Sequence, residues 1–327
     1  MKKKIALILG VTGQDGSFIA DLLVKKNYLV HGFVRKSATG NLKNIKDLIE
    51  TKKIQIHHGD VLDYSSLERV FKKVKPDEIY NFADQDHVRW SSELPIYSFD
   101  VTGSSLIKIL EIIKNSLPKT KYFHPFSSNI FGNSNNSQIS ENENFSPLSI
   151  YALGKVTAYH ACKIYRDVHK LKIYGAIFFN HESERRPEEY VTRKITKAVA
   201  KIFYNKQKKL KLGDVSAKID WGYAKDYVEA AYKIMQKKKP QFFIIGSGKK
   251  TSVIEFVKKC FSYVKMDYKK YLIIDKKLFR KGATKTLVAN TKKAKKEINF
   301  KIKTNINNLV KIMMDNDLKA ERKKIEQ

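Results

Sequence analysis

The sequence is poor in cysteine, glycine and proline, and it has no long hydrophobic run. Its 327 residues include 2 Cys, 15 Gly and 7 Pro. This composition excludes collagen-like and low-complexity chains, and Cys162 and Cys260 lie too far apart to suggest a disulfide framework or a zinc site. No stretch reaches the ~18 apolar residues of a membrane-spanning helix. We therefore expect a folded protein of a reducing compartment, the cytoplasm, with no metal site and no membrane partner.

Acidic residues are also scarce, because 33 Asp and Glu stand against 64 Lys and Arg, which gives a formal net charge of +31. A charge of this size suggests a nucleic-acid or anionic-membrane partner. The lysines are spread through every segment, however, and do not gather on one predicted element. We expect solvated basic surfaces and no specific nucleic-acid partner.

Short apolar runs alternate with helical periodicity through the first half of the chain. The first residues imitate a secretory signal, but the apolar stretch continues directly into glycines, and we interpret it as a strand. The runs predict strands at Ile5–Leu9, Tyr28–Val34, Ile54–His58, Glu78–Phe82 and Tyr122–Phe126. Alternation at this period predicts right-handed crossovers and an α/β fold with a doubly wound parallel sheet.

The pattern becomes less regular after about residue 180. It predicts short strands at Leu210–Leu212, Phe242–Ile245 and Tyr271–Ile274, and helices near 191–204, 226–236, 252–264 and 305–314. We interpret residues 1–180 as a dinucleotide-binding domain and residues 181–327 as a smaller α/β substrate-binding domain, with segments that can interleave. A ligand cleft between the two is expected.

A glycine-rich turn follows the first strand and opens a helix. Glycines at Gly10, Gly13 and Gly16 let the backbone approach a pyrophosphate, whose charge the helix N-terminus receives. In an alternating chain this motif indicates a Rossmann dinucleotide site. The residues expected to contact the cofactor are Gly10, Thr12, Gly13, Gln14, Asp15, Gly16, Arg35, Lys36, Asp60, Val61, Tyr151 and Lys155.

Two cations follow the second strand, where a carboxylate would bind the ribose hydroxyls of NAD. Arg35 and Lys36 suit a 2′-phosphate, which favours NADP over NAD. The alternative is that a basic pair has no meaning in so lysine-rich a chain. Asp60 and Val61, after the third strand, are placed to contact the adenine.

Tyr151 and Lys155 are separated by one helical turn. We expect the ammonium to lower the pKa of the phenol toward the working pH and make it a general base for a hydroxyl proton, as hydride leaves carbon. Ser127, at the end of the fifth strand, is expected to share the reacting oxygen with Tyr151.

Together these residues resemble the extended short-chain dehydrogenase/reductases, and among them the GDP-mannose 4,6-dehydratase family. The motifs that carry the resemblance across nearly the whole chain are Gly13-Gln-Asp-Gly-Ser17, Val34-Arg-Lys-Ser37, Gln85-x-His87-Val88, Phe179-Asn-His-Glu-Ser183, Val191-Thr-Arg-Lys194 and Asp220-Trp-Gly222 with Ala224-Lys-Asp-Tyr-Val228.

The resemblance implies NADP or NAD, held tightly, and a GDP-sugar substrate in a homotetramer or homodimer. In the family mechanism the residues at Tyr151 and Ser127 remove the O4 proton while C4 gives hydride to the nicotinamide. The positions implied or expected to bind substrate are Asp86, Ser127, Asn129, Asn180, Val191, Lys194 and Arg280.

This sequence departs from the family pattern at several functional positions. The family has a Glu, two residues after the hydroxyl, that removes the C5 proton and drives loss of the 6-hydroxyl, and Asn129 stands there. Losing a general base costs about 10²- to 10⁴-fold. Asp84 and Asp86 replace a family Ala and Ser, either as new bases or, as we favour, to bind further sugar hydroxyls. Ile219 and Ala283 replace two residues that contact the nucleotide.

We therefore expect an oxidoreductase that acts at C4 of GDP-mannose or GDP-manno-heptose and gives a 4-keto sugar without 6-dehydration, for surface polysaccharides. The alternatives are a 4,6-dehydratase with a displaced base, a 4-epimerase, a nucleic-acid-binding protein that kept a dinucleotide fold, and a catalytically inactive regulator. Intact Ser127, Tyr151 and Lys155 disfavour the last two.

Overall fold

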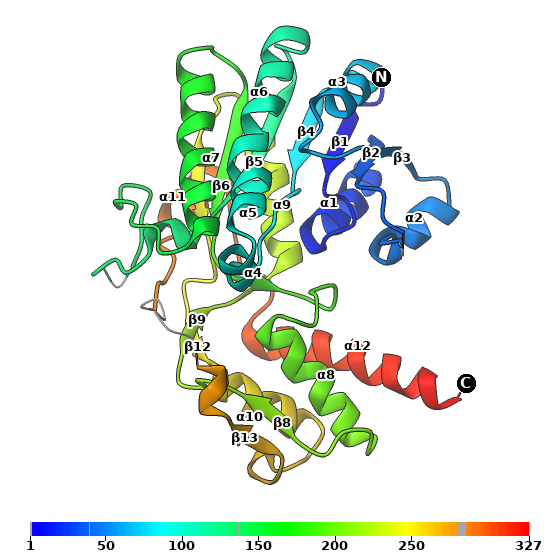
Figure 1. Cartoon of the computed structure of the whole chain (residues 1–327), viewed down its shortest axis with the longest axis vertical. Coiled ribbons are helices and arrows are strands. Elements are labelled where there is room, and N and C mark those ends of the chain that lie inside the picture. The colour runs from blue at the N-terminus through cyan, green and yellow to red at the C-terminus, as the bar shows by residue number, and fades with distance from the viewer. Residues whose placement is uncertain (1, 39, 137, 280–285, 327) are drawn as a thin grey trace.

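A seven-stranded parallel sheet forms the centre of a larger lobe (Figure 1). The computed structural model describes residues 2–38, 40–136, 138–279 and 286–326. The strands, in spatial order, are β11 (Phe242–Ile245), β6 (Ile173–Phe178), β5 (Lys121–Ser127), β4 (Glu78–Asn81), β1 (Ile5–Leu9), β2 (Leu29–Val34) and β3 (Ile54–His58). Every neighbouring pair is parallel. The predicted doubly wound fold is confirmed, and each of the five strands predicted in the first half lies within one residue of its expected bounds.

Helices cover both faces of this sheet and bury its apolar side chains in two separate cores. The helices of one face are α3 (Tyr64–Val74), α6 (Ser105–Ser116) and α7 (Ile150–Asp167). Those of the other face are α1 (Gln14–Lys25), α2 (Lys46–Glu50), α9 (Ala224–Met235) and α11 (Lys292–Ile298). Burial on both sides explains why the strands are continuous apolar runs, as parallel sheets require.

The smaller lobe lies beyond one end of the sheet (Figure 1). Its helices are α8 (Val191–Phe203), α10 (Val253–Tyr263) and α12 (Ile306–Glu326), and its strands are β8 (Leu210–Leu212), β9 (Lys218–Asp220), β12 (Lys250–Ser252) and β13 (Leu272–Ile274). These elements share a third apolar core. A buried ion pair between Arg193 and Asp317 joins α8 to α12, and the Thr196 hydroxyl donates to the same carboxylate at 2.7 Å.

Short elements connect the two lobes and the helices. They are α4 (Val88–Glu93), α5 (Pro95–Phe99), a π-helical turn η2 (Asp100–Ser104), the two-stranded pair β7 (His181–Glu182) and β10 (Gly222–Tyr223), and the 3₁₀ turns η1 (Lys43–Ile45), η3 (Ser128–Phe131), η4 (Tyr268–Lys270) and η5 (Lys276–Leu278).

The chain crosses between the lobes more than once after residue 180. The run Phe242–Ile245, expected in the smaller domain, is β11 and pairs with β6 at the edge of the large sheet. All four of its residues are buried, because α9 and α11 cover one face of the sheet there and α7 covers the other. The last helix continues to Glu326, beyond the predicted residue 314, since Asp317 on its buried face pairs with Arg193. The assignment of 1–180 and 181–327 to separate binding roles stays a prediction.

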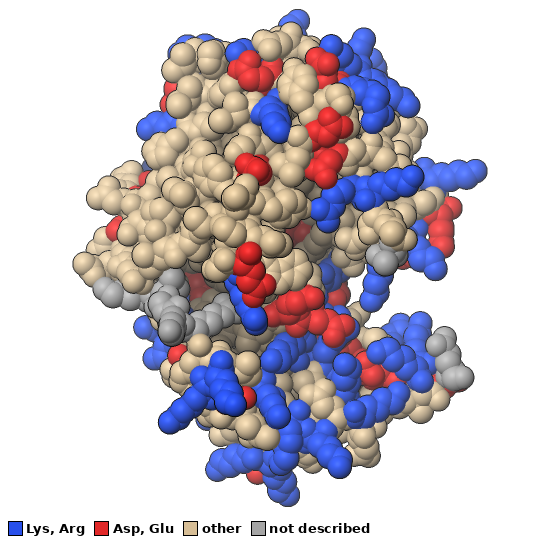
Figure 2. Space-filling model, in the orientation of Figure 1, with Lys and Arg blue, Asp and Glu red and all other residues tan. Residues whose placement is uncertain are grey.

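Basic side chains cover much of the surface in Figure 2, most densely on the smaller lobe, whereas acidic side chains gather where the lobes meet. Within the described ranges, none of the helices combines the length and the apolar character needed to cross a bilayer.

Candidate active site

A cavity of 340 Å³, here called the first cavity, opens where the carboxyl ends of the parallel strands face the smaller lobe. A second cavity of 520 Å³ adjoins it and extends over the glycine-rich turn toward the end of β2. The two share Asp84 and Asp86, on the loop after β4. Ligands of doubly wound sheets bind at this edge, so the two cavities form one extended candidate site.

The structure brings most of the predicted site residues into these cavities. The first is lined by Gly13, Gln14, Asp15, Gly16, Asp86, Ser127, Asn129, Tyr151, Lys155, Asn180 and Val191. The second is lined by Gly10, Thr12, Arg35, Asp60 and Val61. Lys36 and Lys194 are exposed and line neither cavity. Arg280, and with it Ala283, lies outside the described residues.

The glycine-rich turn has a backbone that only glycine allows. Gly10 has φ +71°, and a Cβ built there would lie 2.5 Å from the carbonyl oxygen of Phe82. A Cβ at Gly16 would lie 2.2 Å from the carbonyl oxygen of Gly10, so α1 could not approach β1 as closely. The turn thus leaves the amino end of α1 open to the cavities, a geometry that suits the pyrophosphate of a dinucleotide.

Tyr151 and Lys155 face the first cavity from the first two turns of α7. The hydroxyl of Ser149 caps this helix by accepting from the backbone N–H of Ala152 at 3.1 Å. Ser127 ends β5 and lines the first cavity together with Tyr151, and its hydroxyl accepts from the backbone N–H of Asn129 at 3.3 Å. The three side chains predicted to act together are therefore adjacent.

Lys155 does not act on Tyr151 as the spacing suggested. Its Nζ donates to Asp84 Oδ2 and to the carbonyl oxygen of Pro125, both at 2.6 Å, and lies 6.0 Å from the centre of the Tyr151 ring. Burial, followed by the charges of Asp84 and Asp86, raises the pKa of the Tyr151 phenol above its usual value. The expectation of a lowered phenol pKa is wrong for this arrangement, because burial and the nearby carboxylate charges disfavour the phenolate and Lys155 is paired with one of those carboxylates.

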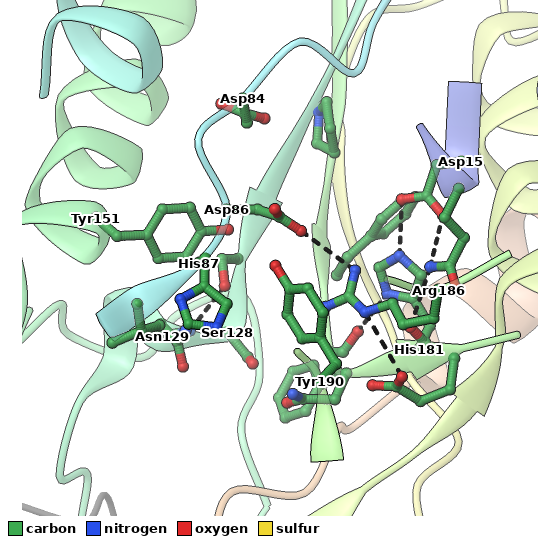
Figure 3. Close-up of a pocket in the computed structure, with 18 of the residues that line it drawn as sticks. Asp15, Asp84, Asp86, His87, Ser128, Asn129, Tyr151, His181, Arg186 and Tyr190 are labelled. Carbon is green, nitrogen blue, oxygen red and sulfur yellow. Dashed lines mark hydrogen bonds and ion pairs between the residues drawn. The ribbon is translucent and has the colours of Figure 1, made fainter. Parts of the chain in front are cut away.

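Asn129 places an amide in the first cavity, which Ser127 also lines, and Figure 3 shows it below Tyr151. Most of the carboxylates around it are engaged by other groups. Asp84 pairs with Lys155, Asp15 pairs with His181, and Asp86 accepts from Arg186 Nη1 at 3.2 Å. Glu182 accepts from the Thr192 hydroxyl at 2.6 Å, and Glu189 is exposed.

Arg186, Asp86 and Tyr190 form a polar group across the cavity from Tyr151 (Figure 3). The guanidinium of Arg186 lies over the Tyr190 ring, 3.4 Å from its centre, and its Nε is 3.5 Å from Glu182 Oε2. Arg186 Nε and the Tyr190 hydroxyl are buried without a hydrogen-bond partner. Polar atoms of this kind are available to a ligand's hydroxyl groups, because buried polar groups need partners.

His181 holds the glycine-rich turn against the strand that leads into the smaller lobe. The backbone carbonyl of Phe179 lies 2.8 Å from Nδ1, and Asp15 Oδ2 lies 2.8 Å from Nε2. The Ser183 hydroxyl donates to Gln14 Oε1 at 2.6 Å. The side chains of Gln14 and Asp15, predicted to contact the cofactor, therefore also connect α1 to the segment around β7.

Two features of the site have no local signal in the sequence. The ion pair of Lys155 with Asp84 joins residues 71 positions apart. Tyr190 is marked only by its place before the Val191 motif, and it was not among the expected residues. The described residues contain no group of three or more His, Cys, Asp or Glu arranged to hold a metal ion.

Comparison with known proteins gives a consistent result. A family model described as GDP-mannose 4,6 dehydratase matches residues 7–313. The chain is 38% identical over 334 residues to GDP-mannose 4,6 dehydratase 1 of Arabidopsis thaliana, which covers 99% of this chain and 92% of that protein. It is 39% identical over 264 residues to GDP-mannose 4,6-dehydratase of Vibrio cholerae, which covers 79% of this chain and 71% of that protein.

Solved structures share the fold at lower identity. dTDP-glucose 4,6-dehydratase of Bacillus anthracis superposes with a TM-score of 0.85 at 20% identity, covering 98% of each chain. UDP-glucose 4-epimerase of Thermotoga maritima superposes with a TM-score of 0.86 at 20% identity, covering 97% of this chain and 99% of that one. By its sequence, over nearly its whole length, the chain belongs to the GDP-mannose 4,6-dehydratase family.

Proposed function

We propose that this protein is an NAD(P)-dependent oxidoreductase that acts at C4 of a GDP-linked sugar, GDP-mannose or GDP-manno-heptose, and gives a 4-keto sugar without removing the 6-hydroxyl. The observation that carries the proposal is the pairing of Tyr151 and Ser127 with an amide at Asn129 in the first cavity. The first two can move a hydroxyl proton, whereas an amide cannot take a proton from carbon.

The nicotinamide cofactor would accept the hydride. The residues that would hold it line the second cavity and its junction with the first: the glycine-rich turn would hold the pyrophosphate, and Asp60 with Val61 would contact the adenine. Arg35 lines the same cavity, where its Nη1 donates to the Tyr97 hydroxyl at 2.6 Å. A guanidinium at that end suits a 2′-phosphate, which supports NADP over NAD.

The lack of elimination follows from the surroundings of Asn129. Asp84, Asp15 and Glu182 each accept from a neighbouring side chain, which makes each a weaker base to replace one at position 129. Oxidation at C4 acidifies the C5–H bond, but the next step still needs a positioned base. The proposed product is therefore the 4-keto sugar, which can be released or reduced from the other face to the 4-epimer.

A 4,6-dehydratase with a displaced base is the second candidate. The relatives from A. thaliana and V. cholerae are named as dehydratases. Asp86 lines the first cavity, and its side chain is 49% exposed despite the contact with Arg186. It is the carboxylate best placed to take over proton removal.

Exposed apolar side chains support self-association through the face of the larger lobe formed by α5, α6 and α7. These side chains are Ile96, Ile107, Leu153, Ile164 and Val168, each between 42% and 78% exposed. A cluster of this kind on adjacent helices marks an interaction surface. We propose that two copies of the chain contact each other through this surface, either as a homodimer or as one pair within a homotetramer.

The cellular setting belongs to the same proposal. Cys162 and Cys260 are buried free thiols, which agrees with the reducing cytoplasm. We place the reaction in nucleotide-sugar supply for surface polysaccharides.

Two measurements test the proposal. Mass spectrometry first identifies the cofactor released from the purified protein. The products from GDP-mannose and GDP-manno-heptose, each with NADP and with NAD, are then analysed in the same way. Loss of two hydrogens from the sugar, with reduced cofactor accumulating or already bound, is the expected result. A product lighter by one water establishes the dehydratase instead. An unchanged mass with a new stereoisomer establishes the epimerase.

A further inference from the structure

Asp84 lies at the junction of the two cavities and contributes to the lining of both. Only 10% of its side chain is exposed. Oδ2 accepts from Lys155 Nζ at 2.6 Å, and Oδ1 is buried with no hydrogen-bond partner. The loop that carries Asp84 is fixed by Gln85, whose Oε1 accepts from the Ser98 hydroxyl at 2.7 Å. The carboxylate is therefore held in place against the ammonium.

The contacts of Lys155 pair its charge with a carboxylate. Both of its hydrogen bonds, to Asp84 Oδ2 and to the Pro125 carbonyl, are made to acceptors outside α7. An isolated ammonium one helical turn from Tyr151 would favour the phenolate, but an ion pair has little net charge and exerts a much weaker effect. The other carboxylate oxygen, Oδ1, is buried without a hydrogen-bond partner.

We propose that Asp84 is a positioning residue of the proton-transfer site: its carboxylate neutralises the Lys155 ammonium beside Tyr151 and so raises the pH above which the buried phenol gives up its proton. The effect of Asp84 on catalysis, unlike its effect on the phenol titration, rests on the proposed role of Tyr151 in oxidation at C4. With Asp84 intact, oxidation at C4 by hydride transfer therefore requires a higher pH than it would with a neutral side chain at that position.

Other groups facing the phenol do not account for the effect alone. Burial contributes most to the raised pKa of Tyr151, the charge of Asp84 comes next, and Asp86 follows, whereas the Ser127 hydrogen bond and Arg186 oppose the rise. Burial likewise raises the pKa of Asp84, with Lys155 opposing it. The other ionisable groups that interact with Asp84 or Lys155 include Asp15 on α1, Tyr122 and His124 on β5 and Cys162 on α7.

The test is a pH titration of the Tyr151 phenol in the full-length protein. NMR of protein labelled with ¹³C at tyrosine Cζ reports the protonation state at each pH. The Tyr151→Phe variant assigns the resonance. In Asp84→Asn the onset of titration should move at least about one pH unit lower than in the wild type, which is about tenfold more phenolate at a given pH. Glu189→Gln, which removes an exposed carboxylate from the same cavity wall, should leave the titration unchanged.

Asp84→Ala provides a second variant that keeps the experiment decisive if the Asn variant does not fold, because the related family has Ala at this position. Far-UV circular dichroism checks the fold at each pH. An onset of titration in both folded variants at the same pH as in the wild type overturns the inference.

A kinetic measurement separates this inference from the proposed function. The acid limb of kcat/KM for C4 oxidation should move to lower pH in Asp84→Asn, whereas a merely structural defect lowers kcat/KM equally at every pH. If the phenol titration moves but the wild type oxidises no GDP-sugar, the proposed function fails and the inference stands. If the wild type oxidises the sugar and neither the titration nor the acid limb moves, the inference fails alone.

Discussion

His181 Nε2 lies 2.8 Å from Asp15 Oδ2, in an ion pair that joins β7 to the first turn of α1. The two side chains are 13% and 17% exposed. Burial disfavours both charges, but the mutual attraction and hydrogen bond prevail, so the pKa of Asp15 is lowered and the pKa of His181 is raised. The pair fixes the dinucleotide turn relative to the segment that begins the smaller lobe.

This pair predicts a pH-dependent loss of stability in His181→Gln. A His whose pKa is raised on folding stabilises the fold fully below its ordinary value of 6.5, and that stabilisation is lost as pH rises through the raised value. An Asp whose pKa is lowered stabilises above 3.8, and loses this as pH falls through the lowered value. Both contributions are fully present between pH 3.8 and pH 6.5, the ordinary pKa values of Asp and His. The variant should therefore be most destabilised in this range, by on the order of 3 kcal/mol, since Asp15 stays buried without its cation.

Urea unfolding of both proteins at about pH 5, 7 and 9 measures this difference. The gap in unfolding free energy should be largest at the lowest of these pH values and should narrow toward the highest. A gap that is constant with pH would mean that His181 contributes packing against Tyr227 and not charge.

Replacing Tyr151 with Phe should lower C4 oxidation by about 10²- to 10⁴-fold, because the phenol is the proposed proton-transfer group. Dinucleotide binding, measured by fluorescence titration, should be retained. Tyr159→Phe is the matched control, since Tyr159 lies on the same helix but lines neither cavity and packs on Phe126, Phe145 and Phe242. Equal activity of the Tyr151 variant and the control would refute the assignment.

A carboxylate at position 129 should restore elimination. In Asn129→Glu, the product from GDP-mannose should include a species lighter by one water, because a base then lies beside Ser127 and Tyr151. Asn129→Gln has similar size and no basic group, and should give none. Product masses are compared by mass spectrometry. If the wild type itself loses water, Asp86→Asn should abolish that loss, as a displaced base requires.

Cofactor choice should depend on Arg35 and not on Lys36. Arg35→Ala removes the guanidinium that lines the second cavity and should raise KM for NADP by about 10-fold or more, with little change for NAD. Lys36→Ala should have little effect on either, because Lys36 is exposed and lines neither cavity. Initial rates with both cofactors measure this. An equal effect of the two variants would point to diffuse charge instead of a specific contact.

A charge on the apolar face of α5 and α7 should break self-association. Ile96→Lys and Ile164→Lys change side chains that are 78% and 52% exposed in the single chain. Either should shift the protein to a smaller species in light scattering coupled to size-exclusion chromatography. Ile325→Lys, on α12 and 51% exposed, is the matched control and should leave the mass unchanged. No shift in the first two variants would place the contact elsewhere.

The sequence by itself determined the features that depend on near neighbours. Continuous apolar runs such as Ile5–Leu9 were sufficient to locate the strands of the sheet, since a strand buried on both faces has no polar alternation. The spacing of Gly10, Gly13 and Gly16 located the turn at the head of α1, and one helical turn placed Tyr151 and Lys155 in the same cavity.

Only the tertiary structure decided which partner each charge has. Lys155 pairs with Asp84, and Asp15 pairs with His181, across 71 and 166 positions of the chain. The return of β11 to the edge of the large sheet was likewise invisible locally, because Phe242–Ile245 would be equally apolar as a strand of either lobe. Ion pairs and sheet edges depend on which distant segments the crossovers bring together. For the same reason, the proposed control of Tyr151 protonation depends on Asp84, which lies on the loop after β4 and not on the helix that carries Tyr151.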